Sequence, residues 1–92
     1  MRIDWSPPAL ADLQSISEHI EQDRDLDTAN RVARAIYDAV QTLRRMPRRG
    51  RRGRVEGTRE LVLPRLPYVV VYQVSVDRVI VLSVVHGAQR WP

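Results

Sequence analysis

The stretch that decides the fold is YVVVYQVSVDRVIVLSVV, which spans residues 68–85. β-Branched and aromatic residues fill residues 68–74 and again 79–85, and these residue types favour extended strands. The four residues between the two runs, Ser-Val-Asp-Arg at 75–78, are typical of a hairpin turn. Both runs are apolar at successive positions, which predicts central strands with both faces covered.

Two shorter strands are predicted outside this hairpin. Residues 2–5 alternate polar and apolar side chains, and residues 59–63 contain strand-forming residues. Pro64 and Pro67 then bracket a turn that leads into the hairpin. The sequence therefore predicts four strands.

Two amphipathic helices are predicted between the first and second strands. Ser6 followed by two prolines is typical of a helix start, because the hydroxyl can cap the helix and proline needs no amide hydrogen bond there. Residues 21–27 are expected to connect the helices, with Asp27 or Thr28 capping the second, and Pro47 to end it. The apolar stripes are Leu10, Leu13, Ile16 and Ile20 in the first helix, and Ala29, Val32, Ile36, Val40 and Leu43 in the second.

The predicted element order is β-α-α-β-β-β in one domain over residues 1–92. This order predicts an α+β fold in which a helical hairpin packs on one face of a small, twisted, mostly antiparallel sheet. The opposite, concave face is expected to carry the polar functional groups.

Composition excludes several kinds of chemistry. The chain has no cysteine and no lysine, so it has no thiolate ligand and no lysine acid, base or nucleophile. His19, His86 and scattered carboxylates are too sparse to predict a metal site, and no cofactor is expected. No apolar run approaches the roughly 20 residues of a membrane span, so a cytoplasmic protein without a membrane partner is expected.

Charge is unevenly distributed along the chain. Residues 1–43 hold four arginines and eight acidic residues, a balance of −4, whereas residues 44–92 hold eleven arginines and three acidic residues, a balance of +8. An anionic partner, either nucleic acid or an acidic protein segment, is expected for the basic half. The densest run of arginines lies in and just before a predicted glycine-containing loop at 48–57. It comprises Arg44, Arg45, Arg48, Arg49, Arg51, Arg52 and Arg54.

Four segments in this order and spacing resemble the RelE/ParE superfamily of type II toxin–antitoxin toxins. They are residues 3–13, which match its first strand and helix start, 57–61 and 68–74, which match its second and third strands, and 84–88, which match its fourth-strand exit. The resemblance implies a toxin that arrests growth until a cognate antitoxin, with an acidic C-terminal segment, covers it. RelE-like members cleave messenger RNA in the ribosome, whereas ParE-like members poison DNA gyrase by binding.

The residues that would carry RNA cleavage are mostly missing. The two second-strand lysines of RelE correspond approximately to Glu60 and Val62, and the arginine after its third-strand tyrosine corresponds to Val69. The resemblance therefore favours the ParE-like function. A RelE-like ribosome-dependent nuclease with a rewired site, and an inactive module that still binds its antitoxin, are the alternatives.

Four residues are candidates for contact with a target. His86 is the candidate general acid or base of the nuclease alternative, because an imidazole titrates near neutrality; otherwise it is a hydrogen-bonded residue that ends the last strand. Arg59, Arg65 and Arg90 are candidate phosphate or target contacts. Trp91, beside Arg90, is expected to cover an edge of the core or to present a stacking ring.

Overall fold

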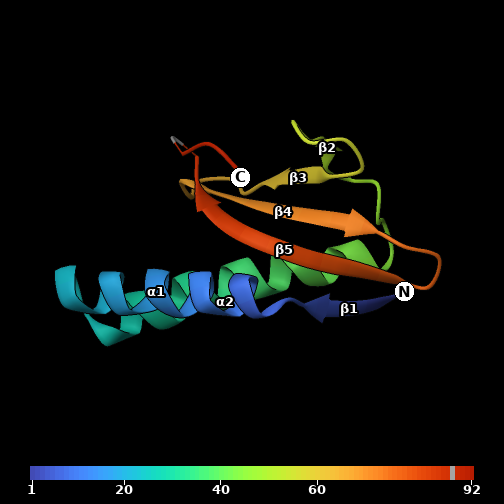
Figure 1. The fold of residues 1–92 in the computed structure, drawn as a ribbon. Coiled ribbons are helices and arrows are strands. Elements are labelled where there is room, and N and C mark those ends of the chain that lie inside the picture. The colour runs from blue at the N-terminus through green and yellow to red at the C-terminus, as the bar shows by residue number, and fades with distance from the viewer. Residues whose placement is uncertain (88) are drawn as a thin grey trace.

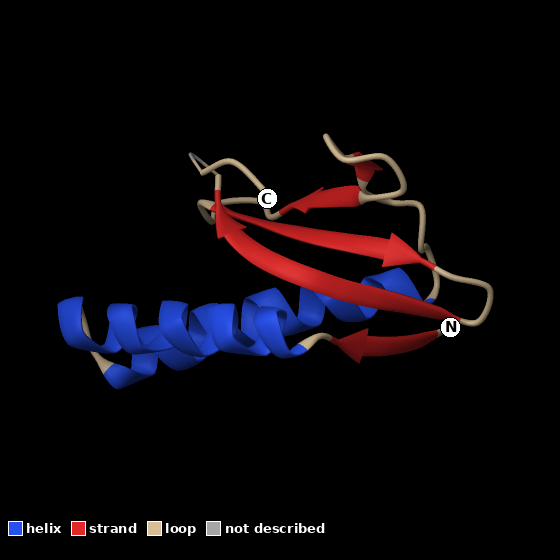
Figure 2. Cartoon of the chain, viewed as in Figure 1, coloured by secondary structure: helices blue, strands red, loops and turns tan. Residues whose placement is uncertain are grey.

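Two helices lie on one face of a five-stranded sheet in the computed structural model, which describes residues 1–87 and 89–92 (Figures 1 and 2). The α+β fold is thus as predicted, with one additional strand. Ala88, the last residue of the strand-exit motif, lies outside the described residues. The elements are β1 (Arg2–Trp5), α1 (Pro7–Asp23), α2 (Leu26–Gln41), a short 3₁₀ helix η1 (Thr42–Arg44), β2 (Arg51–Arg52), β3 (Arg59–Val62), β4 (Tyr68–Val74) and β5 (Arg78–His86).

The strand order in the sheet is β1-β5-β4-β3-β2. β1 runs parallel to β5, and the other pairs are antiparallel. β4 and β5 are central, as their apolar sequences predict. Because Val71 pairs with Ser83 and Tyr72 with Val81, Leu82 is passed over in a bulge. The bulge lets the core residues on both sides of it face the helices.

α1 and α2 begin at side-chain caps. The Ser6 hydroxyl accepts a hydrogen bond from the Ala9 amide at 3.2 Å and donates one to the Leu82 carbonyl at 3.1 Å, so it also fixes the helix start to β5. The cap of α2 is Asp25, whose carboxylate accepts from the Thr28 amide at 2.6 Å. The expectation of Asp27 or Thr28 as this cap was wrong, because the polar residues after Ile20 continue α1 on its solvent face.

The core lies between the helices and the sheet. In α2 and η1 the predicted stripe is confirmed, and Ile36, Val40 and Leu43 are fully buried. In α1 the stripe lies one residue earlier than predicted at its start, because Ala9 is buried whereas Leu10 is 53% exposed. Among the described residues, no helix is long and apolar enough to cross a membrane.

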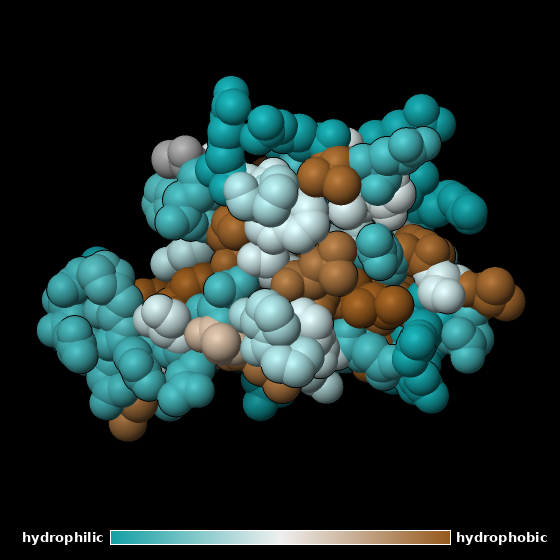
Figure 3. Space-filling model, in the orientation of Figure 1, coloured by the Kyte–Doolittle hydropathy of each residue, from teal (hydrophilic) through white to brown (hydrophobic). Residues whose placement is uncertain are grey.

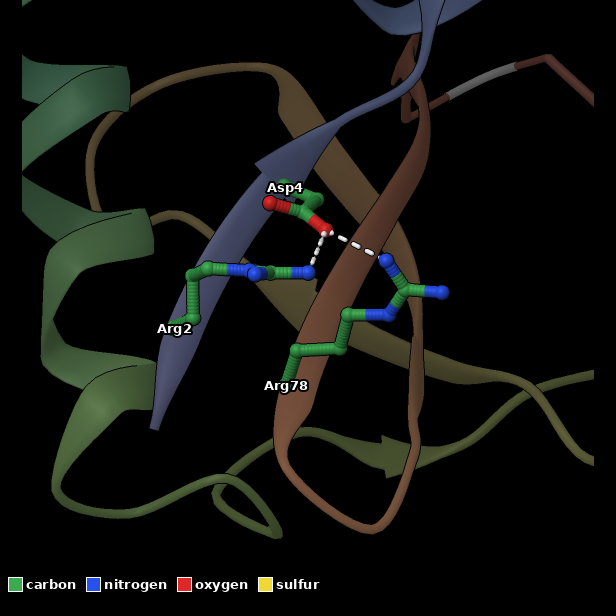
Figure 4. A network of polar contacts seen from close by, with 3 residues as sticks. All are labelled: Arg2, Asp4 and Arg78. Atoms are coloured by element: carbon green, nitrogen blue, oxygen red, sulfur yellow. Dashed lines mark hydrogen bonds and ion pairs between the residues drawn. The ribbon is translucent and has the colours of Figure 1, made fainter.

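A network of charges joins the first strand to the last (Figure 4). Arg2 lies directly opposite Arg78 in the β1–β5 pair, and like charges in this position are destabilising. Asp4 compensates, since its Oδ2 is 2.8 Å from Arg78 Nη1 and 3.2 Å from Arg2 Nη2. Burial alone would raise the pKa of Asp4, but the hydrogen bonds and charges of both arginines hold it below its ordinary value. We assign this cluster a structural role.

Candidate functional site

The segment between η1 and β3, predicted as a basic, glycine-containing loop, is fixed to the sheet by Tyr72. The buried Tyr72 hydroxyl accepts a hydrogen bond from the Gly50 amide at 2.8 Å and donates one to the Pro47 carbonyl at 2.8 Å. A Cβ at Gly50 would lie 2.6 Å from this hydroxyl, so the position requires glycine for close approach rather than for flexibility. Burial raises the pKa of Tyr72, although the Gly50 hydrogen bond and nearby arginines act in the opposite direction.

Arg59 also holds this segment in place. Its Nη1 donates to the Gly50 carbonyl at 2.7 Å and more weakly to the Arg48 carbonyl at 3.3 Å. Arg59, one of the predicted phosphate contacts, is therefore half-buried, and its guanidinium group is hydrogen-bonded to backbone oxygens. Arg65 lies in the turn between β3 and β4 with a φ of 65°, in the left-handed region.

The unpredicted strand β2 divides the basic run between the two faces of the sheet. Arg51 pairs with Glu60, and Arg52 pairs with Arg59. Because successive strand residues point to opposite faces, Arg52 shares the helix-side face with Arg59, whereas Arg51 lies on the other face. Arg51 and Arg52 therefore do not contribute to one continuous patch.

The face opposite the helices is more apolar than predicted. Direct pairing places Val62, Val69 and Val85 in one row of this face, and Val71 lies in the next row with Glu60. Val71 is 1% exposed and Val69 is also buried, so the expectation of a polar face is correct only for its rim. The space-filling view shows hydrophilic residues along the rim above the sheet (Figure 3).

At this rim the chain forms a hollow of about 140 Å³. Val69 and Val85 lie at its base, and Trp91 from the C-terminal segment lines its wall and is half-buried. Arg51 binds Glu60 through both Nε and Nη2, each 2.9 Å from Glu60 Oε1. The charged residues that line the hollow are Arg51, Arg54, Glu60 and Arg90.

His86 lies on the other side of the sheet. It pairs with Tyr68, and the two rings meet edge to face at 6.0 Å between centroids. Both line a cavity of about 470 Å³ beneath α1, together with Asp12 and His19. The Asp12 carboxylate closes the edge of β5 beyond the end of β1, because its Oδ2 accepts from Ser83 Oγ at 2.6 Å and from the Val84 amide at 2.9 Å.

His86 and Arg90 are therefore not brought together. Arg90 lines the hollow on the face opposite the helices, whereas His86 lines the cavity on the helix side, and Gln89 lines both. Sequence reasoning did not identify Asp12, Glu60 or Tyr72 as organising residues, because each acts through contacts distant in sequence. Among the described residues, no group of three or more His, Asp or Glu side chains is placed to hold a metal ion.

Comparisons with known proteins place the chain in the RelE/ParE superfamily of toxins. The sequence profile of the family described as "ParE toxin of type II toxin-antitoxin system, parDE" matches residues 3–91, so the chain belongs to this family. Y4kP of Sinorhizobium fredii, a protein provisionally named a toxin, is 46% identical over 91 residues, which cover 99% of this chain and 93% of that protein. A solved structure of the chromosomal ParDE system from P. aeruginosa superposes with a TM-score of 0.88 at 26% identity, covering 94% of this chain and 95% of that one.

Proposed function

We propose that this ParE-family toxin arrests growth by binding and poisoning DNA gyrase, and that a cognate antitoxin neutralises it. The observation that carries the proposal is the separation of His86 from Arg51 and Arg90, which line hollows on opposite faces of the sheet. The face that bears these arginines can bind an anionic partner, but His86, the candidate proton-transfer group, lies on the other face.

RNA cleavage through the 2′-hydroxyl requires an acid, a base and stabilisation of the charged transition state. Arginine stabilises charge but does not exchange protons readily. Glu60, the carboxylate beside the arginines, is held by Arg51 at 2.9 Å. A single proton-transfer group contributes typically about 10²–10⁴-fold, so His86 on the other face would be a poor substitute for a complete site.

Binding to gyrase requires no such apparatus. An interface needs apolar anchors that exclude water and charged groups that give complementarity. The valine-rich sheet face, with Val62 50% exposed and arginines at its rim, offers both.

The antitoxin is proposed to contribute an acidic C-terminal segment. The balance of +8 in residues 44–92 favours an acidic partner, whose binding would also reduce self-repulsion. The likeness to the chromosomal ParDE system from P. aeruginosa supports a paired system of this kind. The exposed arginines of residues 44–54 are the expected docking region.

A His86→Ala variant tests the mechanism in cells. Induced without antitoxin, the parent and His86→Ala should both stop growth, leave translated messages intact and induce the DNA-damage response. If His86→Ala grows normally while its fold and antitoxin binding survive, and the parent cuts translated messages, the chain is a nuclease. Normal growth of the parent at confirmed expression of folded protein would instead indicate an inactive antitoxin-binding module.

A further inference from the structure

The hollow at the rim of the sheet is lined by two arginines, Arg54 and Arg90, that have no partner among the residues the structure describes. Arg51 is committed to Glu60, but within the described part of the chain neither Arg54 nor Arg90 forms a hydrogen bond or ion pair. A guanidinium group stays charged at any physiological pH and offers a planar set of donors that matches phosphate oxygens. Two such groups beside one hollow form an anion site that no group in the described part of the chain fills.

Trp91 gives this hollow a second kind of contact. Trp91 is half-buried and lines the hollow together with Arg90, Val69 and Val85. A partly exposed aromatic ring next to arginines is the arrangement with which proteins stack a base while they hold the strand's backbone. An acidic peptide would use the arginines but would gain little from the ring.

The size of the hollow suits a small anionic group. Its volume of about 140 Å³ is enough for a phosphate group, and the hollow is open to solvent, so the attached base need not enter it. The base would then lie outside, against Trp91. Glu60 does not oppose this, because Arg51 neutralises it.

We infer that this hollow binds a backbone phosphate of a nucleic-acid strand between Arg54 and Arg90, with Trp91 stacking on the adjacent base. The strand is DNA, and this choice rests on the proposed function, because gyrase holds cleaved DNA while it is poisoned. The toxin would then contact the DNA of the gyrase complex as well as the enzyme. Trp91 and Arg90 thereby acquire a role in target binding that is separate from the antitoxin-docking region.

The test is fluorescence anisotropy of labelled single-stranded dT12 titrated with purified toxin, without gyrase, over a range of salt concentrations. Arg54→Ser/Arg90→Ser should bind at least tenfold more weakly than the parent. Its plot of log K against log salt should be flatter by about 0.7, since each phosphate of a single strand that the protein neutralises contributes about 0.7. Trp91→Ala should weaken binding by about tenfold.

Matched control variants distinguish the effect of the hollow on dT12 affinity from the effect of net charge. Arg24→Ser/Arg34→Ser removes the same charge from exposed helix positions and should change the affinity less than twofold. Tyr37→Ala is the control for Trp91, since Tyr37 is an exposed aromatic residue on α2. Thermal unfolding of each variant confirms that the fold is retained.

Three results would overturn the inference. The first is an equal loss of affinity in both double variants, which would indicate non-specific attraction. The second is tight binding of a labelled glutamate decamer, dependent on Arg54 and Arg90, with none of dT12. The third is preference for rU12 over dT12 by tenfold or more, which would make RNA the ligand.

The inference and the proposed function can fail separately. The toxin could bind dT12 through the hollow and yet leave supercoiling by gyrase unchanged. That result would contradict the proposed function and keep the phosphate site. Conversely, the Arg54→Ser/Arg90→Ser variant could inhibit gyrase as strongly as the parent does. That result would overturn the inferred contact with gyrase-bound DNA and keep the proposed function.

Discussion

The hydroxyl of Tyr72 in β4 lies 2.8 Å from the backbone amide of Gly50, although 22 residues separate them in the chain. The same hydroxyl donates to the Pro47 carbonyl, so one buried phenol holds both ends of the turn that precedes β2. The sheet core therefore determines where the arginines of this segment are displayed.

Tyr72→Phe should destabilise the chain by about 1–3 kcal/mol, because it leaves the buried Gly50 amide without an acceptor. The free energy of unfolding in urea measures this effect. Tyr37→Phe, which removes a hydroxyl from the exposed face of α2, should change it by less than about 0.5 kcal/mol. Equal stabilities for Tyr72→Phe and the parent would show that the loop is not held by this hydroxyl.

Asp12 makes a similar long-range connection between α1 and the edge of β5. Asp12→Ala should cost about 1–3 kcal/mol, because the Val84 amide and Ser83 hydroxyl both lose their acceptor. Asp12→Asn should cost less, since its amide oxygen can still accept a hydrogen bond. Asp38→Ala on the exposed face of α2 is the matched control. Comparable losses for Asp12→Ala and Asp38→Ala would assign no special role to this carboxylate.

The elements with strong local patterns were predictable from sequence. β-Branched runs identified β4 and β5, and the Ser6-Pro7-Pro8 sequence identified the start of α1. β2 was missed because two arginines carry no strand pattern, and their pairing depends on contacts made by Tyr72 and Arg59.

The candidate site was less predictable for a related reason. His86 and Arg90 lie four residues apart in the sequence, and both were candidates for contact with a target. The alternation of β5 and the path of the C-terminal segment place them at different hollows. Which face a residue occupies near the end of a strand depends on register and bulges, and the Leu82 bulge was not visible in the apolar run.

The charge network at β1 predicts a pH dependence of stability. The pKa of Asp4 is lowered in the folded chain from its ordinary value of 3.8, so the unfolded chain binds more protons in this range. The stabilisation is present above pH 3.8 and is lost as the pH falls through the lower, folded pKa. Asp4→Asn should therefore flatten the acid side of a plot of unfolding free energy against pH. A plot with the same acid slope as the parent would contradict this role for Asp4.

The exposed arginines of residues 44–54 should govern the rate at which the antitoxin associates. Replacing Arg48, Arg52 and Arg54 by Ser should slow association about tenfold at low salt and flatten its salt dependence, because the loss of steering charge acts mainly on the on-rate. The control is the variant in which Ser replaces Arg24, Arg31 and Arg34. These exposed residues belong to the helical hairpin, and their replacement makes the same change in charge. Stopped-flow mixing measures both. Equal slowing of the two triple variants would place the antitoxin's docking region elsewhere.

Supercoiling of relaxed plasmid by purified gyrase tests the central claim most directly. The purified toxin should inhibit supercoiling and cause cleaved gyrase–DNA complexes to accumulate, and equimolar antitoxin should reverse the inhibition. His86→Ala should inhibit as strongly as the parent, because binding requires no proton transfer. Unimpaired supercoiling at saturating toxin, together with cutting of messages when ribosomes are supplied, would contradict the account.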